Sequence, residues 1–379
     1  RREYIQANSA APMDSGIKTV DYYAKRGKEE FVKLEQSDEQ NRKIWKQFVD
    51  WSMEKFLKIN SLMDILEFDH HWPESFYEDK MPAVLEKLKS KNLLVKSQGA
   101  QIVNLEDQGL GVAVVVKSDG GTTYLLRDLA TFIHRKALGF DKQLYVVDNR
   151  QSHAFKQLFT ILALLGEIET GEAVQIDFGF MSFKGSALST RKGNMVLAED
   201  VIKEAEEKVA KLIEQKNPDL PHKEAVVKTV AKAALKYYDL SHNRHSDIEF
   251  DWKDVLDFEG NSGPYLQYTY ARLSSILRKA GNVSGTPTQD ISATEHQLAV
   301  EASKLNEVIE DSLKDYLPNI LVNYLFTLAN LANKFYHESQ VVSETDEAKK
   351  VFRILLIEKV RTTLAQGLSL LGISVLEEM

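Results

Sequence analysis

The length and composition of the chain exclude several classes of protein. The sequence has 379 residues, 43% of them hydrophobic and 27% charged, with a formal net charge of −8. Because it contains no cysteine, a disulfide framework, an iron–sulfur cluster and a thiolate zinc site are excluded. No apolar run reaches the ~18 residues of a membrane span. We therefore expect a cytoplasmic protein with no membrane partner and about two or three domains.

The first part of the chain is expected to be helical. The sequence starts with Arg1 rather than Met, and we interpret it as a piece of a longer protein. Residues from about 17 to 60 have helical spacing, and Ser37 and Gln40 have the spacing of a capping box. A wide apolar face predicts a helix packed against a core, and its central residues are Ile44, Phe48 and Trp51.

Residues 61–198 alternate between strand and helix patterns. Asp119-Gly120 is typical of a hairpin turn, and the flanking strands are predicted at Val112–Lys117 and Thr123–Leu126. Further along, a helical spacing separates two short apolar runs of buried-strand length. A strand, a helix and a strand in this order predict a parallel sheet with a right-handed crossover, with the strands at Leu144–Val147 and Val174–Met181.

From residue 199 onwards the pattern is almost entirely helical. Lys228, Lys232 and Lys236 recur at a spacing of four residues along one helix. Such a row is more often solvated surface than a ridge that contacts phosphates. After a break at Gly260–Pro264, several apolar stripes predict a helical bundle.

One cationic loop is a candidate binding site. The segment Met181–Val196 contains Lys184, Arg191 and Lys192 but no acidic residue, although the whole chain is acidic. Cations and small hydrogen-bonding side chains on a loop suit a triphosphate, whose charge must be neutralised when pyrophosphate leaves. The spacing is not that of a P-loop, and a solvated basic loop explains the pattern equally well.

Two further segments place polar side chains at element ends. Asp148 follows a predicted parallel strand and precedes a helix, a position at which open α/β sheets bind ligands. Asp148 could hold a ribose hydroxyl, and Gln151 or His153 could bond a small substrate, although simple helix capping is an alternative. Tyr124 and Asp128, four residues apart, indicate a polar pocket, unless Asp128 is only the cap of a helix starting at 129.

Histidine clusters do not predict a metal site. His70 is adjacent to His71, and His242 lies close to His245 and Asp247. Neither group has a third ligand at a convincing spacing, and structural histidines are commoner than metal ligands. We therefore predict no metal site.

Together these segments resemble one family. The chain is similar to the carboxyl-terminal two-thirds of bacterial-type arginyl-tRNA synthetases, which are class I aminoacyl-tRNA synthetases. The resemblance extends from about residue 40 to 379. It is carried by FDHHWPESFYEDKM (68–81), KSDGGTTYLLRDLATFIHRK (117–136), LYVVDNRQSHAFKQLF (144–159), FGFMSFKGSALSTRKGNMV (178–196), EGNSGPYLQYTYARLSSILRKA (259–280) and VRTTLAQGLSLLGI (360–373).

The resemblance implies a role for individual residues. It assigns the stabilisation of ATP phosphates to a loop that comprises Ser189, Thr190, Arg191 and Lys192. It assigns arginine recognition to Tyr124, Asp128 and Gln151. A carboxylate suits the planar guanidinium fork of arginine, which lysine could not reproduce. The remaining ATP contacts that it implies are Asp148, His153, Met181, Gly193 and Asn194.

The resemblance also implies an architecture, namely α/β plus all-α. A partial Rossmann-like catalytic domain would precede a helical anticodon-binding bundle. Its aromatic and basic residues suit unpaired bases, and the implied tRNA contacts are Tyr265, Gln267, Tyr268 and Arg272. The expected domains are a linker and connecting segment (1–60), the catalytic domain with a β-hairpin insertion (61–198), a helical junction (199–260) and the anticodon-binding domain (261–379).

The function implied is that of an arginine–tRNA ligase, which takes arginine, tRNA(Arg) and ATP with Mg²⁺ and needs no prosthetic group. The His-Ile-Gly-His-type sequence of class I synthetases does not occur in this chain. We therefore expect a monomeric fragment that cannot form arginyl-adenylate alone. The alternative is a stand-alone tRNA-binding module. A cysteinyl-type synthetase would be expected to show zinc-binding cysteines, and a nucleotidyltransferase would not need a helical anticodon domain.

Overall fold

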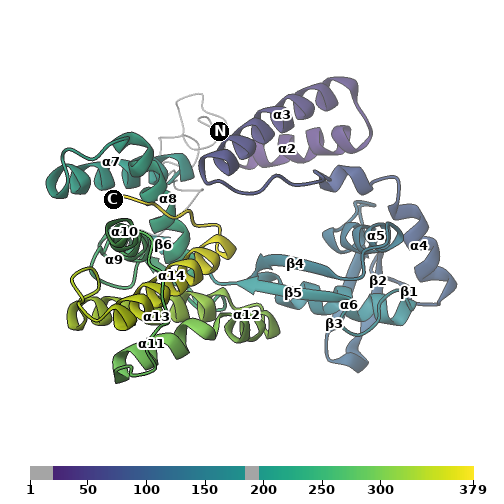
Figure 1. The fold of residues 1–379 in the computed structure, drawn as a ribbon. Helices are drawn as coiled ribbons and strands as arrows, with labels where there is room; N and C mark the ends of the chain where they lie inside the picture. Colours follow the sequence, from purple (N-terminus) through teal and green to yellow (C-terminus); the bar gives the residue numbers. More distant parts are fainter. Residues whose placement is uncertain (1–19, 184–195) are drawn as a thin grey trace, which may run out of the picture. The chain divides into compact units, whose positions relative to one another are not determined.

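The computed structural model describes residues 20–183 and 196–379 and divides into two compact units. The sheet unit comprises Glu67–Met181 and His242–Ile248. The other described residues form the helical unit, and each unit is described separately below (Figure 1).

The helical unit begins with an antiparallel pair of helices, α2 (Val20–Glu35) and α3 (Glu39–Leu62). The predicted capping box at Ser37 is wrong. Ser37 instead adopts a positive φ of 65°, and Asp38 caps α3 by accepting a hydrogen bond from the Asn41 backbone N–H at 3.0 Å. Asp38 can take this role because a short carboxylate reaches the free N–H groups of the first turn.

The apolar face of α3 is not packed against a core of the described residues. Ile44, Phe48 and Trp51 are 41%, 57% and 55% exposed, and no side chain of α3 is buried. The helix itself was predicted correctly, but the expectation that this face packs on a core is wrong for the described chain.

The sheet unit opens with short helical elements and an antiparallel meander. After η1 (Glu74–Tyr77) and α4 (Met81–Ser90), three strands pair in the order β1-β2-β3. Along β3, Val112 and Val114 are exposed while Ala113 and Val115 are buried, as expected of an antiparallel sheet with one covered face. Their bounds are Leu94–Ser97, Ala100–Leu105 and Gly111–Val116, with η2 (Glu106–Gln108) between the last two.

The predicted hairpin around Asp119-Gly120 is correct in its turn but wrong in its second strand. Gly120 has a positive φ of 87°, and Val116 forms an isolated bridge with Thr122. The chain then becomes helical, because α5 runs over Tyr124–Ala137 with Thr123 at its N-cap position. Asp128 therefore lies inside α5 and does not cap a helix, so that alternative is wrong.

The predicted parallel unit is confirmed. β4 (Gln143–Asp148) and β5 (Ala173–Phe178) pair in parallel, with Val146 opposite Ile176. Between them the chain passes through η3 (Asn149–Gln151) and α6 (Ser152–Leu165). The crossover places Asp148 at the carboxyl end of a parallel strand, directly before a helix.

The core of the sheet unit lies on one side of the β4–β5 pair. Tyr145 points to this side, and its ring lies 5.2 Å and 5.8 Å from the rings of Phe155 and Phe159 on α6. Buried leucines from α4, α5 and α6 complete this core, notably Leu88, Leu126, Leu129, Leu158 and Leu162.

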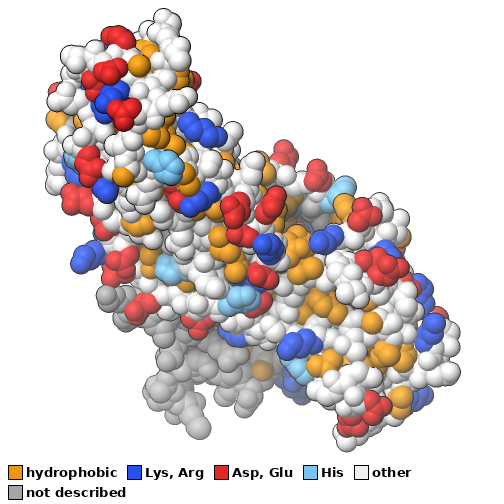
Figure 2. Space-filling model, turned by 60° about the horizontal axis from the view of Figure 1, so that its bottom comes forward, with side chains coloured by type: hydrophobic (Ala, Val, Ile, Leu, Met, Phe, Trp, Pro, Cys, Tyr) orange, Lys and Arg blue, Asp and Glu red, His pale blue; other side chains and the backbone are white. Residues whose placement is uncertain are grey.

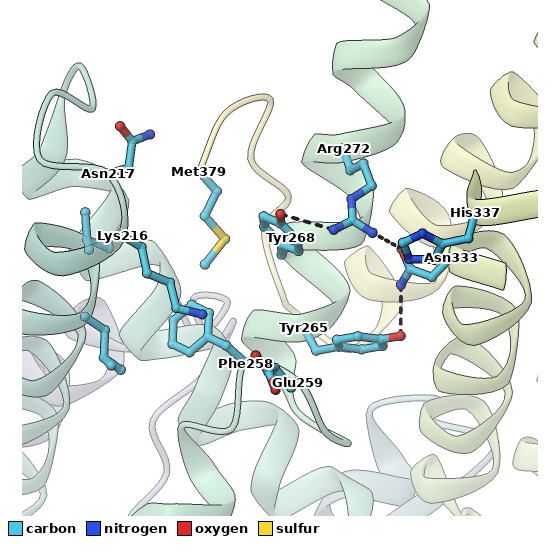
Figure 3. Close-up of a pocket in the computed structure, with 12 residues that line it drawn as sticks. Lys216, Asn217, Phe258, Glu259, Tyr265, Tyr268, Arg272, Asn333, His337 and Met379 are labelled. Atoms are coloured by element: carbon cyan, nitrogen blue, oxygen red, sulfur yellow. Dashed lines mark hydrogen bonds between the residues drawn. The ribbon is translucent and has the colours of Figure 1, made fainter. Parts of the chain in front are cut away.

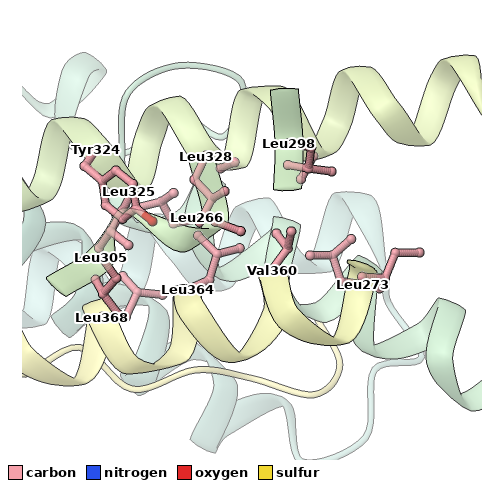
Figure 4. Close-up of a cluster of buried hydrophobic side chains, with 14 of the residues drawn as sticks. Leu266, Leu273, Leu298, Leu305, Tyr324, Leu325, Leu328, Val360, Leu364 and Leu368 are labelled. Carbon is pink, nitrogen blue, oxygen red and sulfur yellow. The ribbon is translucent and has the colours of Figure 1, made fainter. Parts of the chain in front are cut away.

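The rest of the helical unit is a bundle. Its two short strands, β6 (Met181–Phe183) and β7 (Ile248–Phe250), pair with each other. Leucines of α10, α13 and α14 interdigitate in its core (Figure 4). The helices are α7 (Ala198–Lys216), α8 (Lys223–Ser241), α9 (Trp252–Val255), α10 (Gly263–Ala280), α11 (Ala293–Ser303), α12 (Leu305–Lys314), α13 (Pro318–Glu338) and α14 (Glu347–Leu370).

The lysine row on α8 is paired rather than open. Lys228 bonds Glu224, Lys232 bonds Asp64, and Lys236 donates to the Gly372 carbonyl oxygen at 2.6 Å. Acidic and basic side chains are also interspersed on the molecular face in Figure 2. In the part of the chain that the structure describes, no helix is long and apolar enough to cross a membrane.

Candidate functional site

The carboxyl end of β4 is organised around Asp148. Its carboxylate accepts hydrogen bonds from the Arg150 backbone N–H at 2.9 Å and from the Arg150 guanidinium at 2.7 Å and 2.6 Å. The hydrogen bonds from Arg150 lower the pKa of Asp148 to about 2. The capping alternative is therefore realised in this structure, and any ligand of Asp148 must compete with Arg150.

The residues after Asp148 are presented to solvent. Gln151 ends η3 and His153 lies in the first turn of α6, and both side chains are exposed. Met181 starts β6 and is half-buried. Ser189, Thr190, Arg191, Lys192, Gly193 and Asn194 lie outside the described residues.

Asp128 carries the most perturbed carboxyl group of the sheet unit. It is half-buried on α5 and accepts no hydrogen bond from the described residues. Burial, followed by repulsion from the Glu74 carboxylate, raises the pKa of Asp128 to about 6, although Arg135 and Arg127 partly oppose this shift. A half-buried carboxylate with a raised pKa and no paired donor is suited to a cationic ligand.

Tyr124 lies one helical turn before Asp128, so both side chains occupy the same face of α5. The Tyr124 ring is 71% exposed, and the Arg127 guanidinium lies 5.9 Å from its centroid. Arg127 is held by Glu74 at 3.6 Å and donates to the Thr122 hydroxyl at 3.0 Å. The first two turns of α5 thus combine an open aromatic ring with an unpaired acid.

A cluster that the sequence did not predict lies at the end of β5. Asp177 accepts hydrogen bonds from Arg244 and from the Nδ1 position of His245, both at 2.9 Å. Burial would raise the pKa of Asp177, but the bonds from His245 and Arg244 outweigh burial and lower it. Asp247 accepts from the Phe180 backbone N–H at 2.7 Å. Nearly seventy residues separate these partners, so no local sequence signal indicates them.

The helical unit contains a pocket of about 660 Å³ (Figure 3). Three predicted residues, Tyr265, Tyr268 and Arg272, line one wall from α10. Their spacing of three and four residues places them along one face of that helix. The remaining lining residues are Leu212, Ile213, Lys216, Asn217, Phe258, Glu259, Asn333, His337 and Met379.

Arg272 is fixed on that wall by three neighbours, Tyr268, Tyr336 and Asn333. Its guanidinium lies 4.7 Å from the Tyr268 ring centroid and 5.1 Å from that of Tyr336. It donates to the Asn333 amide oxygen at 2.7 Å and to the Tyr268 hydroxyl at 3.1 Å. Asn333 in turn donates to the Tyr265 hydroxyl at 2.8 Å (Figure 3). This network presents two aromatic rings and a cation in one preset arrangement.

Gln267 does not join the pocket. It is fully buried on the opposite side of α10 and donates to the Ser374 carbonyl oxygen at 2.7 Å. Adjacent residues of a helix do not share a face, so Gln267 faces the bundle interior while Tyr268 lines the pocket. The structure therefore brings three of the four predicted residues together.

The rest of the pocket lining includes residues that sequence analysis did not select. Phe258 precedes α10, and the Lys216 ammonium at the end of α7 lies 5.4 Å from its ring centroid. Asn333 and His337 come from α13. These side chains converge only because α7, α10 and α13 all pack on α8, so their sequence spacing carries no signal.

Comparison with known proteins defines the class of this chain. Residues 10–252 match the family described as tRNA synthetases class I (R), catalytic domain. Residues 266–379 match the DALR anticodon binding domain. The chain is thus a class I tRNA synthetase polypeptide with an anticodon-binding domain.

The relatives narrow this class to one family. The chain is 38% identical, over its full length, to an arginine–tRNA ligase of Clostridium botulinum, and 38% identical over 93% of its length to that of Clostridium acetobutylicum. It belongs to the arginyl-tRNA synthetase family. It spans 66% and 63% of the lengths of these two relatives.

Solved structures agree with this fold. The arginyl-tRNA synthetase of Plasmodium falciparum matches with a TM-score of 0.79 at 25% identity, covering 100% of this chain and 67% of that chain. The Thermus thermophilus arginyl-tRNA synthetase matches with a TM-score of 0.76 at 20% identity, covering 100% and 73%. The predicted fold class, a Rossmann-like catalytic domain followed by a helical bundle, is confirmed.

Proposed function

We propose that this chain provides the arginine-selecting and anticodon-binding parts of an arginine–tRNA ligase. In the complete reaction, the arginine carboxylate attacks the α-phosphate of ATP and pyrophosphate leaves. A ribose hydroxyl of the terminal tRNA adenosine then attacks the arginyl carbonyl and AMP leaves. We propose the cytoplasm as the site of action, with the chain acting as a monomer on arginine, ATP with Mg²⁺ and tRNA(Arg).

Asp128 carries the proposal for arginine selection. Ionising an unpaired, half-buried carboxylate costs free energy, as the raised pKa of Asp128 indicates. A guanidinium offsets that free energy by forming two charge-assisted hydrogen bonds with the carboxylate. The exposed Tyr124 ring on the same helix face supplies a surface for stacking the planar cation. We assign Gln151, which is exposed at the start of α6, a further polar contact to arginine.

The ATP side of the proposal is supported by topology and by the resemblance. Ligands of open α/β sheets bind beyond the carboxyl ends of the strands, where Asp148 and His153 lie. Met181 is assigned to the same region. The loop with Ser189, Thr190, Arg191, Lys192, Gly193 and Asn194 is proposed to neutralise the triphosphate, an assignment that depends on the sequence alone.

The pocket in the helical unit is proposed to bind the anticodon loop. Unpaired bases stack on exposed aromatic rings, and Tyr268 presents such a ring beside the Arg272 cation on one wall. Tyr265 lines the same wall. Gln267 is proposed to position α10 by its bond to Ser374, and not to contact RNA directly.

The test of the arginine site is direct binding of arginine to the 379-residue chain by calorimetry at pH 8. We expect Asp128→Asn to abolish the binding heat, because the guanidinium loses the carboxylate proposed to accept its hydrogen bonds. Asp107→Asn changes an exposed carboxyl on η2 of the same unit and should leave the heat unchanged. Equal arginine binding by both variants, or equal affinity for lysine, would contradict the assignment.

A stand-alone tRNA-binding module remains the second candidate function. Its supporting observation is the pocket of the helical unit, which is lined by aromatic and cationic side chains of that unit alone. It predicts salt-dependent tRNA binding without arginine-dependent exchange of pyrophosphate into ATP. The proposed domain division at 1–60, 61–198, 199–260 and 261–379 would be tested by limited proteolysis.

A further inference from the structure

The Arg127 side chain joins three segments of the sheet unit beside Asp128. It is only 17% exposed and pairs with the Glu74 carboxylate of η1 at 3.6 Å. It donates to the hydroxyl of Thr122, which precedes α5, at 3.0 Å. Its guanidinium carbon lies 5.9 Å from the centroid of the Tyr124 ring in the first turn of α5. The planar fork of Arg127 therefore has its partners on η1, before α5 and on α5 itself.

Asp128, the next residue in the chain, is not among these partners. Adjacent residues of a helix point in different directions, and the described residues form no hydrogen bond or ion pair between Arg127 and Asp128. A guanidinium that was free to turn could neutralise Asp128 from within the chain. Because Glu74 and Thr122 hold Arg127, the Asp128 carboxyl group stays open to a guanidinium from a ligand.

Charged and titratable groups on three elements act on Asp128. Burial has the largest effect and raises the pKa of Asp128, and Glu74 on η1 raises it further. Arg135 and Arg127, both on α5, lower it. Tyr145 on β4 is also within electrostatic reach, but burial raises the pKa of Tyr145 and keeps it neutral. Arg127 thus favours the ionised form of Asp128 by its own charge and also offsets the charge of Glu74.

The pairing of Glu74 decides how many open carboxylates a bound cation meets. With Arg127 in place, Glu74 is compensated and Asp128 is not. A single carboxylate binds a planar guanidinium through two parallel hydrogen bonds, a geometry that an ammonium group does not reproduce. Without Arg127, two uncompensated carboxylates would lie within electrostatic reach of each other. Such a pair would attract any cation by charge alone and would distinguish arginine from lysine poorly.

We propose that Arg127 is a positioning residue that makes this site selective for a guanidinium ligand. It neutralises Glu74 and leaves Asp128 as the open carboxylate of the first turns of α5. The proposal rests on the proposed function for the identity of the ligand. The neutralisation of Glu74 belongs to the free chain and can be measured without a ligand.

The first experiment is a titration of the free 379-residue chain by ¹³C NMR. The aspartate carboxyl groups are labelled, and the Asp128 signal is assigned by its loss in Asp128→Asn. We expect Arg127→Gln to raise the pKa of Asp128 by roughly half a pH unit, because a positive charge is lost and Glu74 is left uncompensated. Arg127→Lys keeps the charge and should leave the pKa nearly unchanged. Adding Glu74→Gln to Arg127→Gln should return the pKa to that of the unaltered chain or below it.

The second experiment is calorimetry at pH 8 with arginine and lysine as separate probes. Arg127→Gln should lower the ratio of the arginine affinity to the lysine affinity by about fivefold or more, and adding Glu74→Gln should restore the ratio. The matched control is Arg135→Gln, which removes another positive charge that acts on Asp128 but leaves Glu74 paired. The control should keep the ratio within about twofold of the unaltered chain.

Three results would overturn the proposal. One is an unchanged pKa of Asp128 in Arg127→Gln. Another is an equal loss of arginine and lysine affinity in that variant, which general disruption of the site would cause. The third is a loss of selectivity in Arg135→Gln as large as that in Arg127→Gln. An unaltered chain that binds no arginine would overturn the proposed function instead, and the titration of the free chain would then decide the role of Arg127 independently.

Discussion

The pocket in the helical unit and the polar site on α5 differ in whether their charged groups already have partners within the protein. In the pocket, Arg272 has its hydrogen bonds made by Asn333 and Tyr268 and its faces covered by aromatic rings. On α5, the carboxyl group of Asp128 is half-buried with no bonded donor among the described residues. The charged group of the first site is already paired within the protein, whereas that of the second has no hydrogen-bonded partner among the described residues.

The two units also differ in how completely their apolar surfaces are buried. The bundle core is closed, with Leu266, Leu325, Leu328, Val360 and Leu364 all fully buried (Figure 4). The sheet unit packs one face of β4 and exposes the other. This comparison teaches that the bundle buries its core within itself, whereas the described residues of the sheet unit leave one face of β4 exposed.

The largest expected effect tests the closed core. Leu328→Ala should lower the free energy of unfolding of the helical unit by about 3 kcal/mol, because a cavity remains where α13 packs. Hydrogen exchange of α10 and α14 amides in urea would measure this loss. Val146→Ala, on the exposed face of β4, should leave the stability of the isolated chain nearly unchanged. Similar losses for both variants would remove the distinction between the units.

The next effect tests the preset pocket. Arg272→Ala should weaken binding of a tRNA(Arg) anticodon stem-loop roughly 30-fold, or about 2 kcal/mol. The substitution removes the cation that contacts the rings of Tyr268 and Tyr336, so neither ring is held in place by it. Fluorescence anisotropy would measure the dissociation constant. The control is Arg26→Ala on α2, a surface residue paired with Glu30. Unaltered binding by the Arg272 variant would place the anticodon elsewhere.

A smaller effect tests how arginine binding depends on the ionisation of Asp128. Because the pKa of Asp128 is raised to about 6, the ionised form that pairs with arginine predominates only above that pH. Arginine affinity should therefore fall about tenfold per pH unit below 6, and isothermal calorimetry from pH 8 to 5 would follow the change.

The same raised pKa predicts an effect on stability with a definite sign. Folding favours the protonated form of Asp128, so its contribution to stability is present at low pH and is lost as pH rises through 6. Asp128→Asn should accordingly stabilise the free chain at pH 8 and have little effect at pH 4, as thermal unfolding would show. A destabilised variant at pH 8 would mean that the carboxylate already has a partner.

The smallest effect concerns the lysine row on α8. Lys228→Ala should leave the dissociation constant for whole tRNA unchanged within about twofold, since Lys228 is exposed and already bonded to Glu224. The salt dependence of binding should keep its slope as well. A reduced slope would show that this row contacts phosphates after all.

Local sequence patterns were sufficient to predict the parallel strands β4 and β5. They failed where packing against distant residues decides the secondary structure. Short apolar runs predicted β4 and β5, and the family resemblance selected Tyr265, Gln267, Tyr268 and Arg272. The predicted strand at Thr123–Leu126 was wrong, because α5 packs its leucines into the core and this burial outweighs the β-propensity of Thr123 and Tyr124. Gln267 could not be placed from its neighbours, since helix rotation decides which residue faces the pocket.

By itself, the sequence determined the order of the elements and which residues could bind a cation, a phosphate or a base, because side-chain chemistry and periodicity are local properties. Only the tertiary structure decided which of those residues are already satisfied. Arg150 bonds Asp148, and the α8 lysines find acids or carbonyl oxygens, whereas Asp128 remains without a donor among the described residues. Whether a charged side chain can bind a ligand or is already paired within the protein depends on the groups that folding places beside it. Many of those groups come from distant parts of the chain.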